Sequence, residues 1–470
     1  MIVMTLAALL AAADPVTEAR FDRWMDAVTP STLVVGEDDG AMTLEAMLDA
    51  RDVPGVQVVL IDDWKVVASR AYGLADVASG RAVTTDTRFQ AASISKPVAA
   101  MAMLAMVEDG ALTLDGDVND KLTSWKVPAP DFDGVVTLAG LLSHTAGTSV
   151  SGFPGYAQGD TLPTLPQLLD GKGNTDPVRV TTAPGAEHRY SGGGFTIAEL
   201  MAEDVAGMPF EYIAYREVLA PLGMTRSSYA LGGDIGGPLA FAYDGGGTLV
   251  KGNFHNYPEQ AAAGLWTTAE DLATFALALG RAANGETGLP LTPETARLML
   301  TEVQQGYGLG IGTWEESGAR YFGHGGSNRG YKTMLRFLPE RGEGIVVMTN
   351  GDRGAGVFQS IIGTVANEMG WEGMGPRRLV RASLAPDALA AIAGTYVFGG
   401  QDYVLQVEGD RWRLTDPEGD TEIALPIEGD KVWFPEAEQL FEVERADDGS
   451  VAAITMGGAR LPRTGGPKTD

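Results

Sequence analysis

The sequence predicts an α+β fold in which an antiparallel sheet is flanked by helices and carries an inserted all-helical domain, followed by a small antiparallel β-barrel. Two observations predict the first part: strand-type alternation occurs at residues 55–72 and again over 306–349, and the chain between them is largely helical. A third observation predicts the barrel, because short alternating strands dominate beyond Leu384. The sheet would therefore be assembled from both ends of the first domain.

Composition restricts the function. With 34 Lys and Arg against 62 Asp and Glu, the formal net charge is −28, which disfavours nucleic acids and anionic membranes as partners. The absence of Cys rules out thiolate catalysis, and the four His show no metal-ligand spacing. We therefore expect no metal and no cofactor.

The first residues have the character of an export signal. Residues 1–13 form an apolar run that ends in small residues before Asp14-Pro15, and the run is too short to span a bilayer. We expect a signal peptide and a periplasmic or secreted protein. No Lys or Arg precedes the run, which keeps a cytoplasmic location as the alternative.

The first domain is expected over residues 16–371, with the helical insertion at about 97–260. Its predicted elements are helices within 16–51, a hairpin over 56–72, a buried helix over 93–108, short helical pieces such as 196–206, a helix that begins after Thr268, strands at 306–312, 330–338 and 343–349, and a last helix over 355–369.

The second domain is expected over residues 384–465, after a linker at 372–383. Apolar side chains alternate with polar ones from Tyr403 to Val407, and Glu-Gly-Asp breaks separate the short strands at 408–410 and 428–430. This spacing is typical of tight antiparallel turns, in a barrel or a sandwich.

Ser93 and Lys96 form the strongest local signal for catalysis. Three residues apart at the start of a predicted helix, the two side chains lie on one face. Lysine activates a serine only if its pKa falls from about 10.4 towards 7, a shift that costs about 4 kcal/mol. Burial and the helix dipole would supply it, and the Ser93 N–H would face a developing oxyanion. Taken alone, an incidental Lys at a buried helix start would give the same pattern.

The pattern does not stand alone, because five segments in order resemble the penicillin-recognising serine hydrolases. They are Ser93-Ile-Ser-Lys96, Leu141-Leu-Ser-His-Thr-Ala-Gly147, Tyr190-Ser-Gly192, Ala263-Gly-Leu-Trp-Thr-Thr-Ala-Glu-Asp271 and Gly323-His-Gly-Gly-Ser327. The resemblance is to the class C β-lactamase-like branch, which includes D-aminopeptidases and esterases, and it covers about residues 40–370. The C-terminal barrel resembles a lipocalin-like appendage of some members, which restricts access to the active site.

The resemblance implies a role for each matched residue. Ser93 would attack the carbonyl, while Lys96 and Tyr190 would share the proton transfers, and either could be the formal base. His324 would stand where β-lactamases have the Lys of Lys-Thr-Gly.

The strand that follows His324 would complete the site. Gly325 and Gly326 would let the substrate backbone run beside the strand. The N–H of Ser327 would join that of Ser93 in an oxyanion hole.

Two departures from the family pattern bear on the substrate. Gly192 stands where relatives commonly have the Asn of Tyr-x-Asn, so an amide that contacts the substrate is missing. His324 replaces a permanent cation with a group whose ordinary pKa is near 6.5, so a substrate carboxylate would be held less firmly. A Lys-Thr-Met run at 332–334 resembles the missing box, but its Met would crowd the substrate.

Weaker candidates remain. We expect His144 to be structural, His188 to orient the Tyr190 loop and His255 to lie at the surface. Trp266 and Tyr307 either line the pocket or pack in the core.

The sequence therefore predicts a serine hydrolase that forms an acyl-enzyme on a small-molecule ester, amide or peptide. A carboxylesterase or D-amino-acid peptidase is favoured, with a class C-type β-lactamase and a slowly deacylating penicillin-binding sensor as alternatives. A lipase-type α/β-hydrolase is rejected because no Gly-x-Ser-x-Gly occurs.

Overall fold

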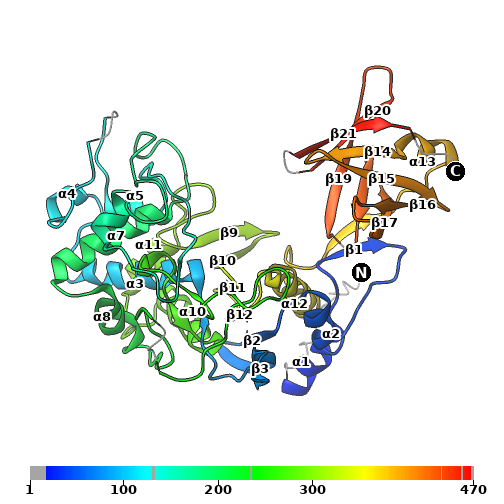
Figure 1. The fold of residues 1–470 in the computed structure, drawn as a ribbon. Helices are drawn as coiled ribbons and strands as arrows, with labels where there is room; N and C mark the ends of the chain where they lie inside the picture. Colours follow the sequence, from blue (N-terminus) through cyan, green and yellow to red (C-terminus); the bar gives the residue numbers. More distant parts are fainter. Residues whose placement is uncertain (1–16, 130–132, 233–235, 436, 457–458, 467–470) are drawn as a thin grey trace, which may run out of the picture. The chain divides into compact units, whose positions relative to one another are not determined.

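The computed structural model describes residues 17–129, 133–232, 236–435, 437–456 and 459–466, so the expected signal at 1–13 lies outside the described part. The chain forms two compact units (Figure 1). Residues up to 28 and 42–375 form the first, and residues 29–41 and those from 376 onward form the second.

The first unit is built on a seven-stranded sheet with the order β4-β3-β2-β12-β11-β10-β9. Its strands are β2 (Gly55–Asp62), β3 (Lys65–Asp76), β4 (Arg81–Ala82), β9 (Gly312–Glu316), β10 (Ala319–Asn328), β11 (Tyr331–Leu338) and β12 (Glu343–Thr349). Early strand β2 pairs with late strand β12 in antiparallel fashion. This pairing confirms the prediction of a sheet assembled from both ends of the domain.

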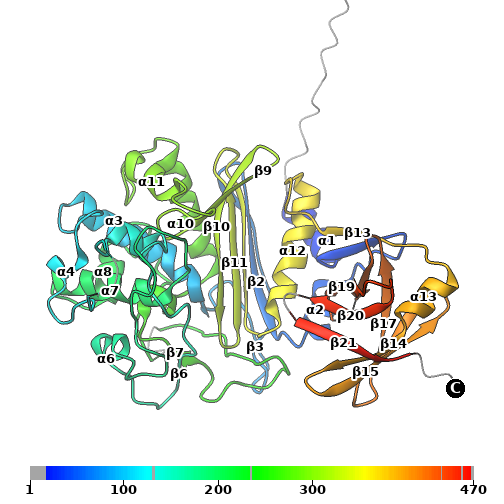
Figure 2. The ribbon, with the colours of Figure 1, turned by 90° about the horizontal axis from the view of Figure 1, so that it is seen from above.

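Strand β2 is buried on both faces. Val56, Val58 and Leu60 pack into one core, whereas the alternate side chains Val59 and Ile61 pack into another. Figure 2 shows the helices that cover the two faces. They are α1 (Glu18–Met25), α2 (Leu44–Ala50) and α12 (Gly354–Met369) on one face, and α3 (Ser95–Glu108), α10 (Ala269–Ala283) and α11 (Pro293–Leu300) on the other side.

Besides α3, α10 and α11, the segment between β4 and β9 holds mostly short helices, two short strand pairs and long stretches without regular structure. Its helices are η1 (Ala92–Ile94, 3-10), α4 (Val118–Lys121), α5 (Leu138–Leu142), α6 (Leu165–Leu169), α7 (Gly192–Ala206), α8 (Phe210–Ala214), η2 (Tyr215–Leu219, a π-helix) and α9 (Gln260–Ala263). Its strands are β5 (Phe89–Gln90), which pairs with β8 (Trp266–Thr267), and β6 (Tyr156–Ala157), which pairs with β7 (His255–Asn256).

One prediction from alternation is wrong, and alternation missed one strand. Within residues 306–311 only Tyr307 forms isolated bridges, and the strand begins only at Gly312. Strand β10 was not among the strands predicted from alternation, because its Gly-His-Gly-Gly centre lacks the β-branched residues typical of strands, and only the family resemblance implied a strand there.

The second unit is a closed barrel of eight antiparallel strands, which confirms the barrel over the sandwich. Its elements are α13 (Pro386–Ile392), β14 (Gly394–Phe398), β15 (Gln401–Glu408), β16 (Arg411–Thr415), β17 (Thr421–Ile427), β18 (Lys431–Phe434), β19 (Gln439–Arg445), β20 (Val451–Met456) and β21 (Ala459–Gly465).

A piece of the N-terminal region belongs to this second unit. Strand β1 (Thr32–Val35) pairs in parallel with β13 (Arg377–Val380), which lies in the segment expected to be a linker. Val34 packs with Leu379, Leu425, Ile427 and Trp433 in a small core of its own. The helical prediction for residues 16–51 missed this strand.

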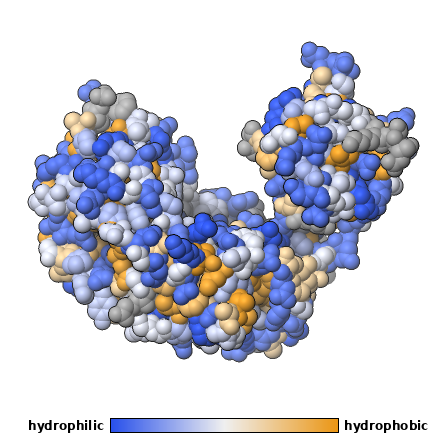
Figure 3. All heavy atoms as spheres, in the orientation of Figure 1, coloured by the Kyte–Doolittle hydropathy of each residue, from blue (hydrophilic) through white to orange (hydrophobic). Residues whose placement is uncertain are grey.

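Polar and charged side chains cover most of the face of both units drawn in Figure 3, in keeping with the net charge of −28. Among the residues that the structure describes, none of the helices combines the length and apolarity that a membrane crossing requires.

The pairing of β1 predicts how the barrel can be removed. Val28 and Met42 exchange backbone hydrogen bonds of 2.8 and 3.1 Å, so a two-residue Asn-Gly turn can replace residues 29–41. We expect a chain that ends at Gly375 and carries this turn to stay monodisperse and to hydrolyse nitrophenyl acetate.

The matched control ends at Gly375 but keeps residues 29–41. It leaves Val34 without its apolar partners, and we expect it to aggregate in light scattering. Equal solubility of the two chains would contradict a structural role for β1.

Candidate active site

Ser93 and Lys96 meet at the junction of η1 and α3. Lys96 Nζ donates to Ser93 Oγ at 3.1 Å and to the Ala262 carbonyl at 2.8 Å. Lys96 is only 2 % exposed, and Ser93 is half-buried. The carbonyl from α9 thus holds the lysine side chain in place beside the serine hydroxyl.

The backbone before Ser93 is strained. Ala92 has φ +50°, a left-handed conformation that costs a non-glycine residue about 1–3 kcal/mol unless its surroundings enforce it. Ser95 Oγ donates to the Ala92 carbonyl at 2.5 Å and accepts from the Leu265 N–H at 2.9 Å. The Tyr229 hydroxyl donates to the Ser95 carbonyl at 2.7 Å. These buried bonds enforce the turn that presents the Ser93 hydroxyl.

Strand β10 approaches this turn very closely. A Cβ on Gly326 would lie 2.2 Å from the Ala91 carbonyl oxygen and 3.1 Å from Ala92 Cβ, so no other residue fits there. Thr333 Oγ1 on β11 donates to the same Ala91 carbonyl at 3.0 Å. Gly326 therefore makes room for the turn before Ser93, a reason that differs from the one expected.

The part of β10 beyond Gly323 is an edge of the sheet. Strand β9 pairs with β10 only as far as Gly323, and η1 packs beside the strand instead. Gly325 lies in this stretch, where a Cβ would meet only the flexible end of Met334 at 3.2 Å, and Ser327 is exposed. An extended substrate can therefore lie along this edge beside Ser93.

His324 is held as a neutral ring. Its Nδ1 lies 2.6 Å from the Gly325 carbonyl, which can only accept, so Nδ1 carries the proton. Its Nε2 then accepts from the Tyr307 hydroxyl at 2.9 Å. Burial, reinforced by the nearby Lys96 charge, lowers the pKa of His324 to about 3. The expectation that His324 titrates near 6.5 is wrong, because that expectation took no account of burial.

Tyr190 lies among aromatic rings next to His324 and Tyr307. It is half-buried, and Lys96 Nζ lies 5.0 Å from the centre of its ring. The ring centres of His144 and His324 are 4.3 and 6.1 Å from that of Tyr190. The structure thus brings Ser93, Lys96, Tyr190 and His324 together at one place.

His144 supports the Tyr190 loop. Its Nδ1 accepts from the Ser191 N–H at 3.1 Å, directly after Tyr190, while its buried Nε2 has no partner among the described residues. Burial lowers the pKa of His144 well below its usual range, so the ring stays neutral. Its hydrogen bond to the backbone after Tyr190 agrees with the structural role predicted for it.

The contacts of Trp266, His255 and Tyr307 show where each of these candidates lies. Trp266 is buried and packs edge-on against Phe254 and Tyr331, so it belongs to the core. His255 is partly buried, with its Nδ1 2.9 Å from the Pro154 carbonyl. Tyr307, which the sequence left undecided, contacts His324 directly.

Gly192 does not leave an empty slot. A Cβ there would lie 2.7 Å from Cε2 of Phe153 and 3.2 Å from the Ser151 carbonyl. The space next to Gly192 is therefore occupied by the Phe153 ring. The sequence analysis missed Phe153, because it lies in a loop about 40 residues from Gly192 and no local pattern links the two.

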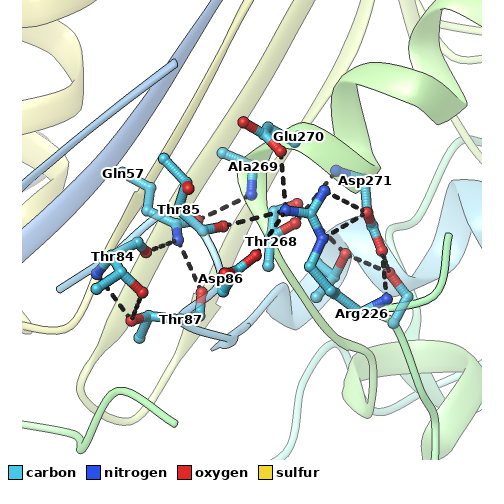
Figure 4. Close-up of polar contacts among 12 residues, drawn as sticks. Gln57, Thr84, Thr85, Asp86, Thr87, Arg226, Thr268, Ala269, Glu270 and Asp271 are labelled. Atoms are coloured by element: carbon cyan, nitrogen blue, oxygen red, sulfur yellow. Dashed lines mark hydrogen bonds and ion pairs between the residues drawn. The ribbon is translucent and has the colours of Figure 1, made fainter. Parts of the chain in front are cut away.

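One buried and one partly buried polar side chain fix the segment that leads to Ser93 (Figure 4). Gln57 on β2 donates to the carbonyls of Thr84 and Thr87 at 2.6 and 2.8 Å and accepts from the Ala269 N–H at 2.9 Å. One amide thereby ties this segment to the central sheet and to the start of α10.

Arg226 makes the second connection. It bonds Asp271 through two nitrogens at 3.3 and 3.0 Å and forms ion pairs with Asp86 at 3.2 Å and Glu270 at 2.8 Å (Figure 4). Because Asp271 is buried, removing the arginine would leave an unpaired charge, a loss that typically costs several kcal/mol.

A buried carboxyl lies just before α9. Both oxygens of Glu259 are buried without a hydrogen-bond partner among the described residues, and burial raises its pKa to about 8. In the described part of the chain, no three His, Cys, Asp or Glu side chains gather closely enough to hold a metal ion.

The fold and the paired Ser93 and Lys96 define the class of protein: a serine hydrolase of the penicillin-recognising type. The family model for beta-lactamases matches residues 41–366, and the chain belongs to the beta-lactamase family.

Curated relatives include proteins of different activities. The chain is 26 % identical to penicillin-binding protein 4 of Amycolatopsis lactamdurans over 75 % of this chain and 95 % of the relative. It is 30 % identical to esterase EstB of Burkholderia gladioli over 39 % of this chain and 51 % of the relative. It is 26 % identical to a D-aminopeptidase of Brucella anthropi over 68 % and 63 %, respectively.

Solved structures of other proteins have a similar fold. An octameric penicillin-binding protein homologue from Pyrococcus abyssi superposes with a TM-score of 0.63 at 23 % identity, over 89 % of this chain and 98 % of that one.

Glu259 predicts a pH-dependent stability. A folded pKa of about 8 against an ordinary value of about 4.3 means that the unfolded state loses its proton first. The contribution of Glu259 to the free energy of unfolding is therefore fully present below about pH 4.3 and is lost as the pH rises to about 8. We expect Glu259→Gln to remove this fall, worth up to about 5 kcal/mol at pH 8.

Urea unfolding at pH 5, 6.5 and 8, followed by circular dichroism, measures the effect. The exposed Glu187→Gln serves as control and should keep the wild-type pH dependence. A Glu259→Gln protein with the wild-type slope would show that this carboxyl does not titrate in the window.

Proposed function

We propose that the protein is a carboxylesterase-type hydrolase of uncharged esters, with Ser93 as nucleophile. The observation that carries the choice of substrate is the neutral His324, which lies where a β-lactamase would offer a cation to the substrate carboxylate. The phenyl ring of Phe153 next to Gly192 supports the same choice, because it replaces a polar contact with an apolar one.

The proposed reaction begins at the Ser93 hydroxyl. Ser93 Oγ attacks the ester carbonyl, and its proton passes to the Lys96–Tyr190 pair in the form that holds one free base, either a neutral Lys96 amine, whose nitrogen is 3.1 Å away, or a Tyr190 phenolate. The same pair then delivers the proton to the departing alcohol. A water molecule then attacks the carbonyl of the acyl-enzyme and gives a proton to the same pair. The pair returns the proton to Ser93 Oγ, and the acid is released.

The charge that develops on the carbonyl oxygen would be stabilised by the N–H groups of Ser93 and Ser327. A single such donor is typically worth about 3 kcal/mol in the transition state. The close contact of Gly326 with Ala91 supports this pairing, because it brings β10 against the turn that carries Ser93.

A D-amino-acid amidase is the second candidate, supported by the D-aminopeptidase of Brucella anthropi, which aligns with two thirds of this chain. Ester and amide substrates pass through the same acyl-serine, so the proposed mechanism applies to both.

We also propose a periplasmic or secreted location, because residues 1–13 have the apolar character of an export signal.

A substrate panel tests the proposal. We expect turnover of nitrophenyl acetate and butyrate to exceed that of D-alanine nitroanilide, and to exceed nitrocefin hydrolysis by about two orders of magnitude or more, since the latter needs a cation for its carboxylate. Nitrocefin turnover equal to that of the esters would identify a β-lactamase. Stable labelling by fluorescent penicillin without turnover of any substrate would identify a sensor.

Variants of the proposed catalytic residues accompany the panel. Ser93→Ala should lose fluorophosphonate labelling and nearly all turnover, because the acyl group then has no acceptor. Lys96→Ala and Tyr190→Phe should each lower kcat by about two to four orders of magnitude, with losses that do not multiply in the double variant. Labelling that survives in Ser93→Ala would overturn the assignment of the nucleophile.

The pH profile tests the state of His324. Because its pKa is about 3, kcat/KM between pH 5 and 8 should contain no ionisation that belongs to this ring. His324→Gln should lower the rate but leave the shape of the profile unchanged, and Tyr307→Phe should do the same. An ionisation near pH 6.5 that disappears in His324→Gln would show that His324 titrates at its ordinary value.

A further inference from the structure

The barrel of the second unit contains a cavity of about 250 Å³. Apolar side chains form most of its wall, among them Leu414, Phe434, Phe441, Ile454, Met456 and Leu461. These residues come from five of the eight strands, so the cavity lies within the barrel itself. The residues of the hydrolytic site proposed above all belong to the first unit.

The strand registers show that the lining residues point inward. Leu414 on β16 pairs with Leu405 on β15, which is fully buried. Tyr403 on β15 pairs with Tyr396 on β14, which is also fully buried. Because directly paired residues in an antiparallel sheet share a face, Leu414 and Tyr403 point into the barrel.

One end of the barrel is filled by protein. Helix α13 places Leu389 and Ile392 in the barrel core. Trp412 Nε1 donates to the Leu389 carbonyl at 3.0 Å, and the Tyr396 hydroxyl donates to the Ile392 carbonyl at 2.5 Å. The cavity therefore occupies the opposite end, where β14 ends at Phe398, which lines the cavity and is 52 % exposed.

The size and chemistry of the cavity define its occupant. Eight-stranded barrels are wide enough either to be filled by side chains or to hold one small ligand. An apolar cavity of about 150 Å³ takes up benzene, so one of about 250 Å³ suits a molecule of two fused rings. The carboxyl of Glu422 in the cavity wall, together with the net charge of −28, disfavours an anion.

We propose that this barrel is a binding site for a small, uncharged, apolar molecule of about two fused rings. The ring system lies against the apolar wall between α13 and the Phe398 end of the barrel. Any polar substituent lies beside polar side chains of the wall such as Gln439, Tyr403 and Glu422. The full chain thus carries two separate small-molecule sites, one in each unit.

Calorimetric titration of the full-length protein at pH 7 with 2-naphthol and 2-naphthoate provides the test. The two probes are matched in size and differ in charge. We expect 2-naphthol to bind with one site per chain, and 2-naphthoate to bind at least about tenfold more weakly. Absence of 2-naphthol binding overturns the site, and equal binding of 2-naphthoate overturns the preference for uncharged molecules.

A pair of neighbouring substitutions locates the site. Leu414→Trp fills the cavity, whereas Thr415→Trp adds the same side chain to the outer face of the strand, because Thr415 is the next residue along β16. Both should keep wild-type turnover of nitrophenyl acetate. Only Leu414→Trp should weaken 2-naphthol binding, by about tenfold or more.

Leu414→Phe, a smaller increase in volume, serves if the larger variant does not fold. Unchanged 2-naphthol affinity in a folded Leu414 variant would place the probe elsewhere, including the hydrolytic site, and would overturn the proposal. The outcome is independent of the substrate panel, because neither substitution lies in the unit that contains Ser93.

Discussion

The contact between β10 and the turn before Ser93 is the constraint on which the rest of the site depends. Gly326 touches the Ala91 carbonyl so closely that a single methyl group would separate the strand from the turn. This contact brings Ser327 and His324 to the serine, although more than 200 residues separate them in the sequence. The strained Ala92 is part of the same arrangement, because its left-handed conformation turns the chain beneath the strand.

The surrounding polar side chains explain how the strain is maintained. Ser95, Gln57 and Asp271 are all buried, and each uses its hydrogen bonds to fix backbone or charge around the segment that carries the nucleophile. Such side chains contribute little net stability when their partners are present, but each is costly once a partner is lost. They thereby favour a single geometry of the catalytic turn. The burial of apolar side chains in the cores on the two faces of the sheet offsets the free-energy cost of the strained turn and of the buried polar groups.

The sequence predicted local geometry well and long-range geometry only through the family resemblance. Ser93 and Lys96 could be paired from their spacing alone, because one helical turn places them on one face. The sheet and the barrel followed from alternation. The Phe153 ring beside Gly192, the hydroxyl of Tyr307 on His324 and the strand β1 could not be predicted, because each depends on a contact between distant segments. The state of His324 depended on burial, which a motif does not reveal.

Strand β1 has a consequence for the order of events during synthesis. The segment 29–41 leaves the ribosome long before β13 and the barrel strands that cover Val34, so a newly made chain carries an unpaired apolar strand while the entire first unit is being translated. Strand β1 can pair only after β13, which follows more than 300 residues later in the chain, has been made, and such late, non-local pairing slows folding. Nascent chains stalled within the first unit would therefore be the species that most need a chaperone.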